Sequence, residues 1–290
     1  MPGVDSFTRA GLTFDVVDGA PTGPRRGAGG APGADGAPDG EAVLLLHGFP
    51  QTSASWASVA VRLRAAGLRV LAPDQRGYSP RARPSGRRAY RIEELVADAA
   101  ALVEASGEGS VHVVGHDWGA VVAWMLAARR PELVRTVTGV SVPHPGAFLA
   151  AMTRSTQALH SWYMAAFQLP ALPELLLRDP RRMAAVLRRA GQASGYARRD
   201  ATALAGATTG PVNWYRALPL ASPATSTTPV QRPSLMVWSD GDSFISRAAV
   251  ERNADFVLAP HRLEVLPGVS HWIPDEAPDR LADLVLEHIG

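Results

Sequence analysis

The sequence predicts an α/β fold in which helices cover both faces of a mostly parallel central sheet and a helical segment is inserted into the chain. Short apolar runs alternate with helix-like segments from residue 42 to residue 140, and this alternation indicates βα units. The alternation stops between 146 and 228 and resumes at 235. An apolar share of 46% over 290 residues is large enough to fill the core of such a domain.

The first part of the chain carries most of the strand signals. Residues 12–17 alternate apolar and polar side chains, as a half-buried strand does. Residues 19–40 are almost wholly Gly, Ala, Pro, Asp and Arg, which predicts a flexible surface loop. Residues 42–46 are all apolar, which is typical of a strand buried on both faces. Further strands are expected at 68–72, 110–114 and 134–140, and helices at 53–66, 92–105 and 121–130.

The later part of the chain begins with the helical insertion. Residues 146–228 have helical patterns interrupted by Pro and Gly, so we interpret them as an insertion between two parts of one core, residues 1–145 and 229–290. Strands at 235–238 and 262–266 and a final amphipathic helix at 278–288 complete the expected fold.

Composition excludes several classes of function. The 29 basic residues are all Arg, nearly balance the 27 acidic residues and are scattered along the chain, so we expect no nucleic-acid partner. Cysteine is absent, which removes disulfides and thiol nucleophiles. No apolar run approaches the ~18 residues of a membrane span, and no signal peptide is visible. We therefore expect a cytoplasmic protein with no membrane partner.

The motif Gly115-His116-Asp117-Trp118-Gly119 follows a predicted strand and opens a predicted helix. It has the Gly-x-nucleophile-x-Gly form of a nucleophile elbow, in which the glycines allow a sharp turn that raises the central side chain above the sheet. The central residue is Asp117, where esterases and lipases have Ser. A turn whose Asp simply caps a helix would look the same, so the motif needs support from elsewhere.

Two later segments give that support. Asp242 lies in a loop after the predicted strand at 235–238, and His271 lies between the last strand and the last helix. The chain therefore carries Asp117, an acid and a histidine in the order of a nucleophilic triad. Asp240 is the alternative acid, but Asp242 lies deeper in the loop and Asp240 suits a turn.

With these motifs the chain resembles the epoxide hydrolase and haloalkane dehalogenase branch of the α/β-hydrolases. The resemblance extends from Val43 to Gly290. It rests on His47-Gly48-Phe49-Pro50, Asp74-Gln75-Arg76-Gly77-Tyr78-Ser79, His116-Asp117-Trp118-Gly119, Asp242 and His271-Trp272. The resemblance implies an α/β-hydrolase fold, in which residues 146–228 form a cap over the active site. It also implies an oxyanion hole made by the backbone N–H groups of Phe49 and Trp118.

An aspartate nucleophile points to a particular class of substrate. Attack by a carboxylate on a saturated carbon leaves an alkyl ester, which water can cleave at the aspartyl carbonyl, whereas attack by Ser would leave an inert ether. Asp117 therefore indicates an electrophilic sp³ carbon, in an epoxide or a carbon–halogen bond. His271 would activate the hydrolytic water, and Asp242 would orient His271.

The leaving group separates these two reactions, because an opened epoxide needs a proton donor and a halide does not. Tyr163 and Tyr215 lie in the segments Ser161-Trp162-Tyr163-Met164 and Asn213-Trp214-Tyr215-Arg216. Both segments resemble those that carry the ring-opening tyrosine pair of epoxide hydrolases. This resemblance implies hydrolysis of an epoxide to a vicinal diol, with simple packing of the cap as the alternative for each tyrosine.

Hydrolytic dehalogenation by the same triad stays open as the alternative function. Against it, Phe49 stands where many haloalkane dehalogenases have a halide-binding Asn, and residues 120–124 are apolar where fluoroacetate dehalogenases have arginines. In its favour, Trp118 and Trp162 carry indole N–H groups that can bind a halide. A binding protein of the same fold is the rival from another class, and the intact triad argues against it.

The remaining expectations concern the pocket and the partners. We expect Trp162, Phe167 and Trp214 to bind substrate, with packing inside the cap as the alternative. The hydrolytic mechanism needs no cofactor. We expect no metal site, because His112 and His116 straddle a strand and a turn. The expected partner is a small-molecule epoxide, and a homodimer is left open.

Overall fold

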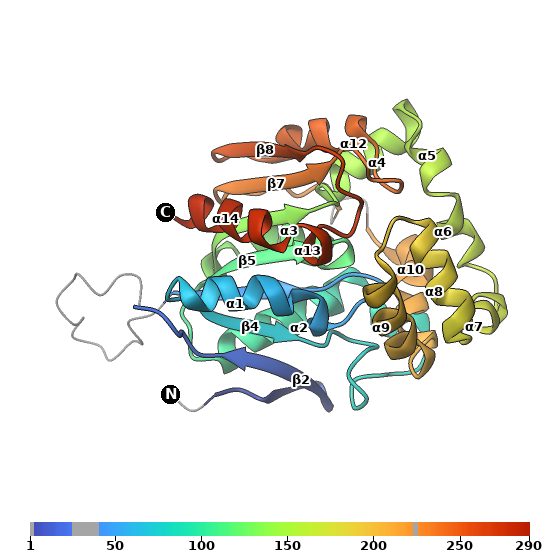
Figure 1. Ribbon diagram of the computed structural model, residues 1–290, viewed down its shortest axis with the longest axis horizontal. Helices are drawn as coiled ribbons and strands as arrows, with labels where there is room; N and C mark the ends of the chain where they lie inside the picture. Colours follow the sequence, from blue (N-terminus) through green and yellow to red (C-terminus); the bar gives the residue numbers. More distant parts are fainter. Residues whose placement is uncertain (1–2, 25–40, 223–225) are drawn as a thin grey trace.

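The computed structural model describes residues 3–24, 41–222 and 226–290, and within them eight strands form a single sheet (Figure 1). The strands are β1 (Ser6–Arg9), β2 (Leu12–Gly19), β3 (Ala42–Leu46), β4 (Arg69–Pro73), β5 (Val111–His116), β6 (Val134–Val140), β7 (Ser234–Ser239) and β8 (His261–Leu266). Their order across the sheet is β1-β2-β4-β3-β5-β6-β7-β8. Strands β3 to β8 pair in parallel, and only the two pairings of β2, with β1 and with β4, are antiparallel, so the predicted, mostly parallel α/β sheet is confirmed.

Both faces of the sheet are covered by helices, which explains the continuous apolar run of β3. Leu44 and Leu46 pack into a core cluster shared with α2 (Ile92–Ala105) and α3 (Trp118–Arg129). Val43 and Leu45 point the other way, into a cluster shared with α1 (Ala57–Ala65) and α14 (Pro278–Ile289). Successive side chains of a strand alternate between faces, so a strand between two helical layers must be apolar at every position.

A second group of helices lies to one side of the sheet, at the right of Figure 1. In chain order the cap segment contains α4 (Pro145–Arg154), α5 (Gln157–His160), α6 (Trp162–Ala166), α7 (Leu172–Leu177), α8 (Pro180–Arg189), α9 (Ser194–Ala205) and α10 (Thr209–Ala217). The chain leaves the sheet after β6, forms these helices and re-enters at β7. We refer to residues 146–228 as the cap.

Several boundaries differ from those that the sequence indicates. Strand β1 was not expected, and β2 extends to Gly19, into the segment interpreted as a loop. The rest of that predicted loop, residues 25–40, lies outside the described residues. Helix α3 begins at Trp118, three residues earlier than expected, because a single residue turns the chain from β5 into the helix.

Shorter elements complete the fold. They are η1 (Ser53–Trp56), η2 (Arg87–Tyr90), η3 (Pro131–Leu133), η4 (Leu218–Leu220), α12 (Arg247–Glu251), η5 (Arg252–Phe256) and α13 (Ile273–Glu276). Among the helices of the described ranges, none combines the length and the apolar character needed to cross a bilayer.

Candidate active site

The predicted triad residues follow three strands of the parallel part of the sheet. Asp117 follows β5, Asp242 follows β7 and His271 follows β8. Because the carboxyl ends of parallel strands meet at one edge of a sheet, these side chains come together there. His271 Nδ1 lies 2.7 Å from Asp242 Oδ2, and His271 Nε2 lies 3.7 Å from Asp117 Oδ2.

The structure also separates the two acids of the β7 loop. Asp242 is buried, and its second oxygen accepts hydrogen bonds from the backbone N–H groups of Phe244 at 2.7 Å and Ile245 at 3.0 Å. Asp240 is exposed and accepts a hydrogen bond from the N–H of Gly268. Asp242 is therefore the carboxylate beside His271, and Asp240 stabilises a turn.

Asp117 lies at a sharp turn of the backbone. Its φ is +53° and its ψ is −118°, a conformation that is strained for a residue with a side chain and that occurs mostly at functional sites. The turn packs tightly beneath the residue, since a Cβ atom on Gly119 would lie 2.0 Å from the carbonyl oxygen of Leu46. Glycine at 119 is therefore needed for α3 to start so close to β3.

Two backbone N–H groups face the Asp117 carboxylate. The N–H of Phe49 donates to Oδ1 at 2.8 Å, and the N–H of Trp118 also donates to the carboxylate. The loop comes this close because residue 48 is Gly: a Cβ there would lie 2.4 Å from the Asp117 Cβ. The N–H of Phe49 thus points at Oδ1, while Oδ2 faces His271.

Charge and burial have opposite effects on the pKa values of Asp117 and His271. Burial alone would raise the pKa of Asp117, but the close contact with His271 and the charge of its ring hold that pKa below the usual value. Burial alone would lower the pKa of His271, but the negative charges of Asp242 and Asp117 raise it to about 10. The two groups therefore form a carboxylate–imidazolium pair near neutral pH.

The two predicted tyrosines lie together above Asp117. Their ring centroids are 5.9 Å apart, and the ring of Tyr215 also contacts that of Trp118, at 5.1 Å between centroids. Burial raises the pKa of both Tyr163 and Tyr215 well above the usual range, and the charge of Asp117 raises it further. Both hydroxyls are therefore protonated near neutral pH and able to donate.

These groups share one cavity of about 730 Å³ between the core and the cap. Asp117, His271, Tyr163, Tyr215 and Phe49 all contribute to its wall. Most of the other residues of the wall are apolar, and several come from the cap: Leu159, Trp162, Ala166, Phe167, Leu172, Leu176, Leu177, Met183, Val186 and Leu187. The cavity therefore suits an apolar molecule with one reactive polar group.

The three aromatic residues expected to bind substrate have different places. Phe167 lines the cavity beside Tyr215, at 4.8 Å between ring centroids, and Trp162 lines it with 70% of its surface exposed. Trp214 does not line the cavity. It is fully buried, and its indole N–H donates to the carbonyl of Arg76 at 2.8 Å. The expectation for Trp214 is thus corrected, because this helix turns only Tyr215 toward the cavity.

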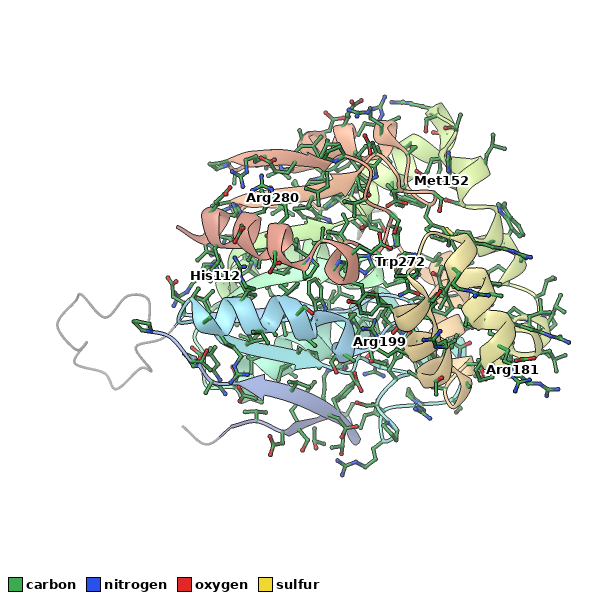
Figure 2. The ribbon with its side chains drawn as sticks, in the orientation of Figure 1. His112, Met152, Arg181, Arg199, Trp272 and Arg280 are labelled. Atoms are coloured by element: carbon green, nitrogen blue, oxygen red, sulfur yellow. The ribbon has the colours of Figure 1, made fainter. Side chains whose placement is uncertain are left out.

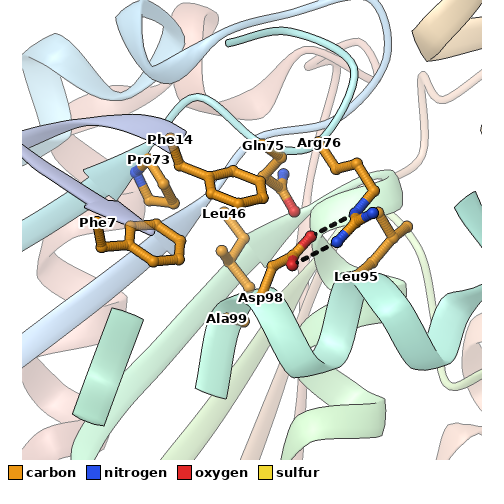
Figure 3. Close-up of a pocket in the computed structure, with 9 residues that line it drawn as sticks. All are labelled: Phe7, Phe14, Leu46, Pro73, Gln75, Arg76, Leu95, Asp98 and Ala99. Atoms are coloured by element: carbon orange, nitrogen blue, oxygen red, sulfur yellow. Dashed lines mark hydrogen bonds and ion pairs between the residues drawn. The ribbon is translucent and has the colours of Figure 1, made fainter. Parts of the chain in front are cut away.

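A buried network supports the loop that carries Phe49. The N–H of Gln75 donates to His47 Nε2 at 3.0 Å. The next residue, Arg76, forms two hydrogen bonds with Asp98, at 2.6 and 2.7 Å, behind a small void walled partly by Phe14 (Figure 3). The motif at residues 74–79 therefore holds the loop of the oxyanion hole in place from below, a role that the sequence alone does not reveal.

A second buried network joins the cap to the core, near Arg199 in Figure 2. Arg199 donates to both Asp200 on α9 and Asp275 on α13, with shortest distances of 2.7 and 2.9 Å. Gln51 and Gln192 also donate to these carboxylates. In the same region, the indole N–H of Trp272 donates to the carbonyl of Ala190 at 3.1 Å. The cap is thereby fixed to the core next to His271.

Comparison with known proteins places this site in a family. The family model described as "alpha/beta hydrolase fold" matches residues 41–278. The AB hydrolase superfamily protein YfhM of Bacillus subtilis (strain 168) is 35% identical over 265 residues, which cover 88% of this chain and 92% of that protein. Epoxide hydrolase A of Mycobacterium tuberculosis is 31% identical over 298 residues, with 88% and 92% covered.

A solved structure gives the same result. The crystal structure of Epoxide Hydrolase A from Mycobacterium thermoresistibile superimposes with a TM-score of 0.76 at 26% identity, and the match covers 98% of this chain and 97% of that one. Sequence and architecture agree over nearly the whole length. The chain therefore belongs to the α/β-hydrolase family.

Proposed function

We propose that the protein is an epoxide hydrolase that opens an epoxide to a vicinal diol through a covalent ester on Asp117. One observation carries the proposal: a carboxylate with a free oxygen and two protonated tyrosine hydroxyls line the same apolar cavity. A nucleophile and proton donors are the two groups that opening of an epoxide requires. The relatives named epoxide hydrolases support the same reaction.

The first half of the reaction is alkylation. Asp117 Oδ2 attacks one ring carbon, and the carbon–oxygen bond of the epoxide breaks as the ester bond forms. The hydroxyls of Tyr163 and Tyr215 bind the ring oxygen, and one of them supplies the proton that the alkoxide takes up. Oδ1 stays in the hydrogen bond from Phe49, so Oδ2 is the oxygen that is free to attack.

The second half is hydrolysis of the ester. The negative charge of Asp117 is one of the causes that raise the pKa of His271. Alkylation removes this charge, so the pKa of His271 falls. The proton that His271 loses restores the hydroxyl of the ionised tyrosine, and neutral His271 can then take a proton from water as the water attacks Cγ of Asp117. The N–H groups of Phe49 and Trp118 stabilise the resulting oxyanion. The ester bond then breaks as His271 returns its proton to the departing alkoxide oxygen, which releases the diol.

Dehalogenation is less well supported by the positions of the indoles. A halide site would need the N–H groups of Trp118 and Trp162 to converge. Trp118 is buried with its ring against Tyr215, whereas Trp162 is 70% exposed. The leaving-group side of the cavity thus presents hydroxyls that suit an alkoxide rather than a pair of free indole donors.

The decisive experiment separates the two halves. In His271→Gln, alkylation should proceed and hydrolysis should stall, so intact-protein mass spectrometry should show the mass of the epoxide added to the protein. Asp117→Asn, measured on fresh protein, is the matched control and should show no adduct. A single turnover of the wild type in ¹⁸O-water should place solvent oxygen in Asp117.

Two results would contradict the proposal. If the first-turnover diol takes its oxygen directly from solvent and His271→Gln forms no adduct, then Asp117 is not the nucleophile. If haloalkanes release halide while a panel of epoxides yields no diol, then the dehalogenase alternative is correct.

A further inference from the structure

The outer surface of the cap is unusually apolar. Of the twelve large hydrophobic side chains that are exposed in the described residues, nine belong to the cap, although the cap is less than a third of the chain. They are Leu149, Leu159, Trp162, Leu169, Leu172, Leu175, Leu176, Val186 and Leu218. Exposed apolar residues that gather on one part of a surface usually mark a binding site.

Five of these side chains surround the active-site cavity. Leu159, Trp162, Leu172, Leu176 and Val186 are exposed to solvent and also line the cavity. We call these five residues the apolar rim. The most exposed of them are Leu159 at 75% and Trp162 at 70%. The cavity wall thus includes solvent-exposed apolar side chains of the cap, which are poorly suited to water.

The same part of the molecule carries a strong positive charge. The cap contains nine arginines and only three acidic residues, Glu174, Asp179 and Asp200. Each of these acids forms an ion pair, with Arg216, Arg182 and Arg199 respectively. Over its described residues this leaves six exposed arginines of the cap without an acidic partner: Arg154, Arg178, Arg181, Arg188, Arg189 and Arg198.

Helix α8 combines the two features. Met183 and Leu187 are buried against the rest of the cap, while Arg181 and Arg188 are exposed. Figure 2 shows Arg181 at the outer end of the cap, on the side away from the core. A basic helix beside exposed Trp and Leu side chains is the arrangement that lies in the plane of an anionic bilayer surface.

We propose that the cap docks on an anionic lipid surface, with the apolar rim and the neighbouring exposed Leu175 of α7 inserted among the acyl chains and the unpaired arginines on the lipid headgroups. The charge selects this occupant. A second copy of the same cap would bring two strongly positive surfaces together, and an isologous contact of like charges is unfavourable. This proposal departs from the expectation of no membrane partner, which was argued from the lack of a spanning segment. Docking lies on the membrane surface and needs no such segment.

Docking of this kind affects how the substrate reaches the cavity, and this part of the inference rests on the proposed function. An apolar epoxide dissolves in the hydrocarbon layer rather than in water. With the rim inserted, the substrate passes from the bilayer into the cavity without crossing water. The docking itself is independent of the chemistry and is measured without any epoxide.

The test is cosedimentation of the full chain with vesicles of phosphatidylcholine alone or mixed with phosphatidylglycerol. The protein should bind the mixed vesicles, bind phosphatidylcholine alone much more weakly, and be released by high salt. Arg181→Ala should reduce the affinity roughly fivefold and Leu175→Ser roughly tenfold. Neither side chain lines the cavity, so turnover of a water-soluble epoxide should be unchanged in both variants.

Matched controls come from the core. Val61 on α1 is 63% exposed, and Arg280 on α14 lies far from the cap in Figure 2, so Val61→Ser and Arg280→Ala should bind like the wild type. Failure of the wild type to bind the mixed vesicles at low salt overturns the proposal. An equal loss of vesicle affinity in the two control variants also overturns it. A dimer in sedimentation equilibrium that Leu175→Ser dissociates overturns it as well, because it would assign the surface to a second copy of the chain.

Discussion

The hydroxyl of Ser141 donates a hydrogen bond of 2.8 Å to the backbone carbonyl oxygen of His271. His116 Nε2 donates to the same oxygen at 3.0 Å, and both donors are fully buried. Ser141 follows β6 directly and has a φ of +66°, which is strained for a residue other than Gly. His271 is therefore held through its backbone as well as through its contact with Asp242.

We predict that Ser141→Ala slows hydrolysis of the ester and leaves alkylation nearly unchanged. Loss of one hydrogen bond of about 1 kcal/mol lets the His271 backbone shift, and the rate of ester decay should fall roughly five- to tenfold. The decay is followed by mass spectrometry after a single turnover. Ser106→Ala removes a buried bond of the same kind, from Ser106 to Val103, and should have no such effect. Equal slowing of both steps would contradict a positioning role.

The tyrosines should act on the other half of the cycle. Tyr163→Phe and Tyr215→Phe should each slow alkylation, and the double variant should lose about 10²–10⁴-fold, which is typical of general acid catalysis. The measurement is the rate of adduct formation in the His271→Gln background. Tyr196→Phe, on α9 and outside the cavity wall, is the control. A double variant with wild-type rates would show that the tyrosines only pack the cap.

The pH dependence of alkylation should depend on His271. Asp117 reacts as the carboxylate, and its pKa lies below the usual value of 3.8, so wild-type alkylation should be flat from about pH 5 to 8. In His271→Gln, Asp117 stays buried but loses its cationic partner, so the pKa of Asp117 rises. The pH at which the alkylation rate falls off on the acid side therefore moves upward. Adduct formation measured from about pH 4 to 7 tests this shift. His261→Gln is the control and should leave the pH profile of adduct formation unchanged. An unchanged profile in His271→Gln would contradict the ion pair between Asp117 and His271.

Gly119→Ala should prevent the elbow from closing. The new Cβ would lie 2.0 Å from the carbonyl oxygen of Leu46, which belongs to a buried strand and cannot move aside. We expect a loss of about 3 kcal/mol or more in the free energy of unfolding, measured by urea denaturation. Gly195→Ala on α9 adds a Cβ that meets no atom within 4 Å and should be neutral. A stable Gly119→Ala protein would show that β3 and α3 are packed less tightly.

Arg199→Ala should weaken the attachment of the cap. It leaves the carboxylates of Asp200 and Asp275 buried without their cation, and this should cost roughly 3–5 kcal/mol in the free energy of unfolding. Burial already raises the pKa of Asp275 to about 6, so in acid this carboxyl is protonated and needs no cation. The loss of unfolding free energy in Arg199→Ala should therefore be smaller in acid and grow as the pH rises through 6. Arg198→Ala, exposed and next in sequence, is the control. Equal effects of the two changes would exclude a structural role for this network.

The sequence allows much of the core to be predicted, because buried strands and turns have local signatures. The apolar run of β3 and the alternation of strands and helices predict a parallel α/β fold, which the structure confirms. The residues at the carboxyl ends of β5, β7 and β8 are predictable for a related reason. Parallel topology places these ends at one edge, so the order along the chain suffices to bring Asp117, Asp242 and His271 together.

Features that depend on distant residues had no such signature. Ser141 looks like any polar residue after a strand, and its bond to His271 joins positions 130 residues apart. Asp200 and Asp275 meet through Arg199 although α9 and α13 lie in different parts of the chain. Trp214 and Tyr215 are adjacent in sequence and aromatic, and only the packing of α10 decides which of them reaches the cavity.

Strands β6 and β7 are hydrogen-bonded neighbours, with Val140 opposite Val237, and the whole cap lies in the chain between them. A segment with adjacent ends can be lengthened, shortened or exchanged during evolution without breaking any pairing of the sheet. The nucleophile precedes this segment and both of its partners follow it, so the triad is inherited with the sheet, whereas the proton donors Tyr163 and Tyr215 belong to the cap. The recognition of different molecules can then diverge through the cap alone, and a cap grafted from another member at these two strand ends would be the natural unit of exchange.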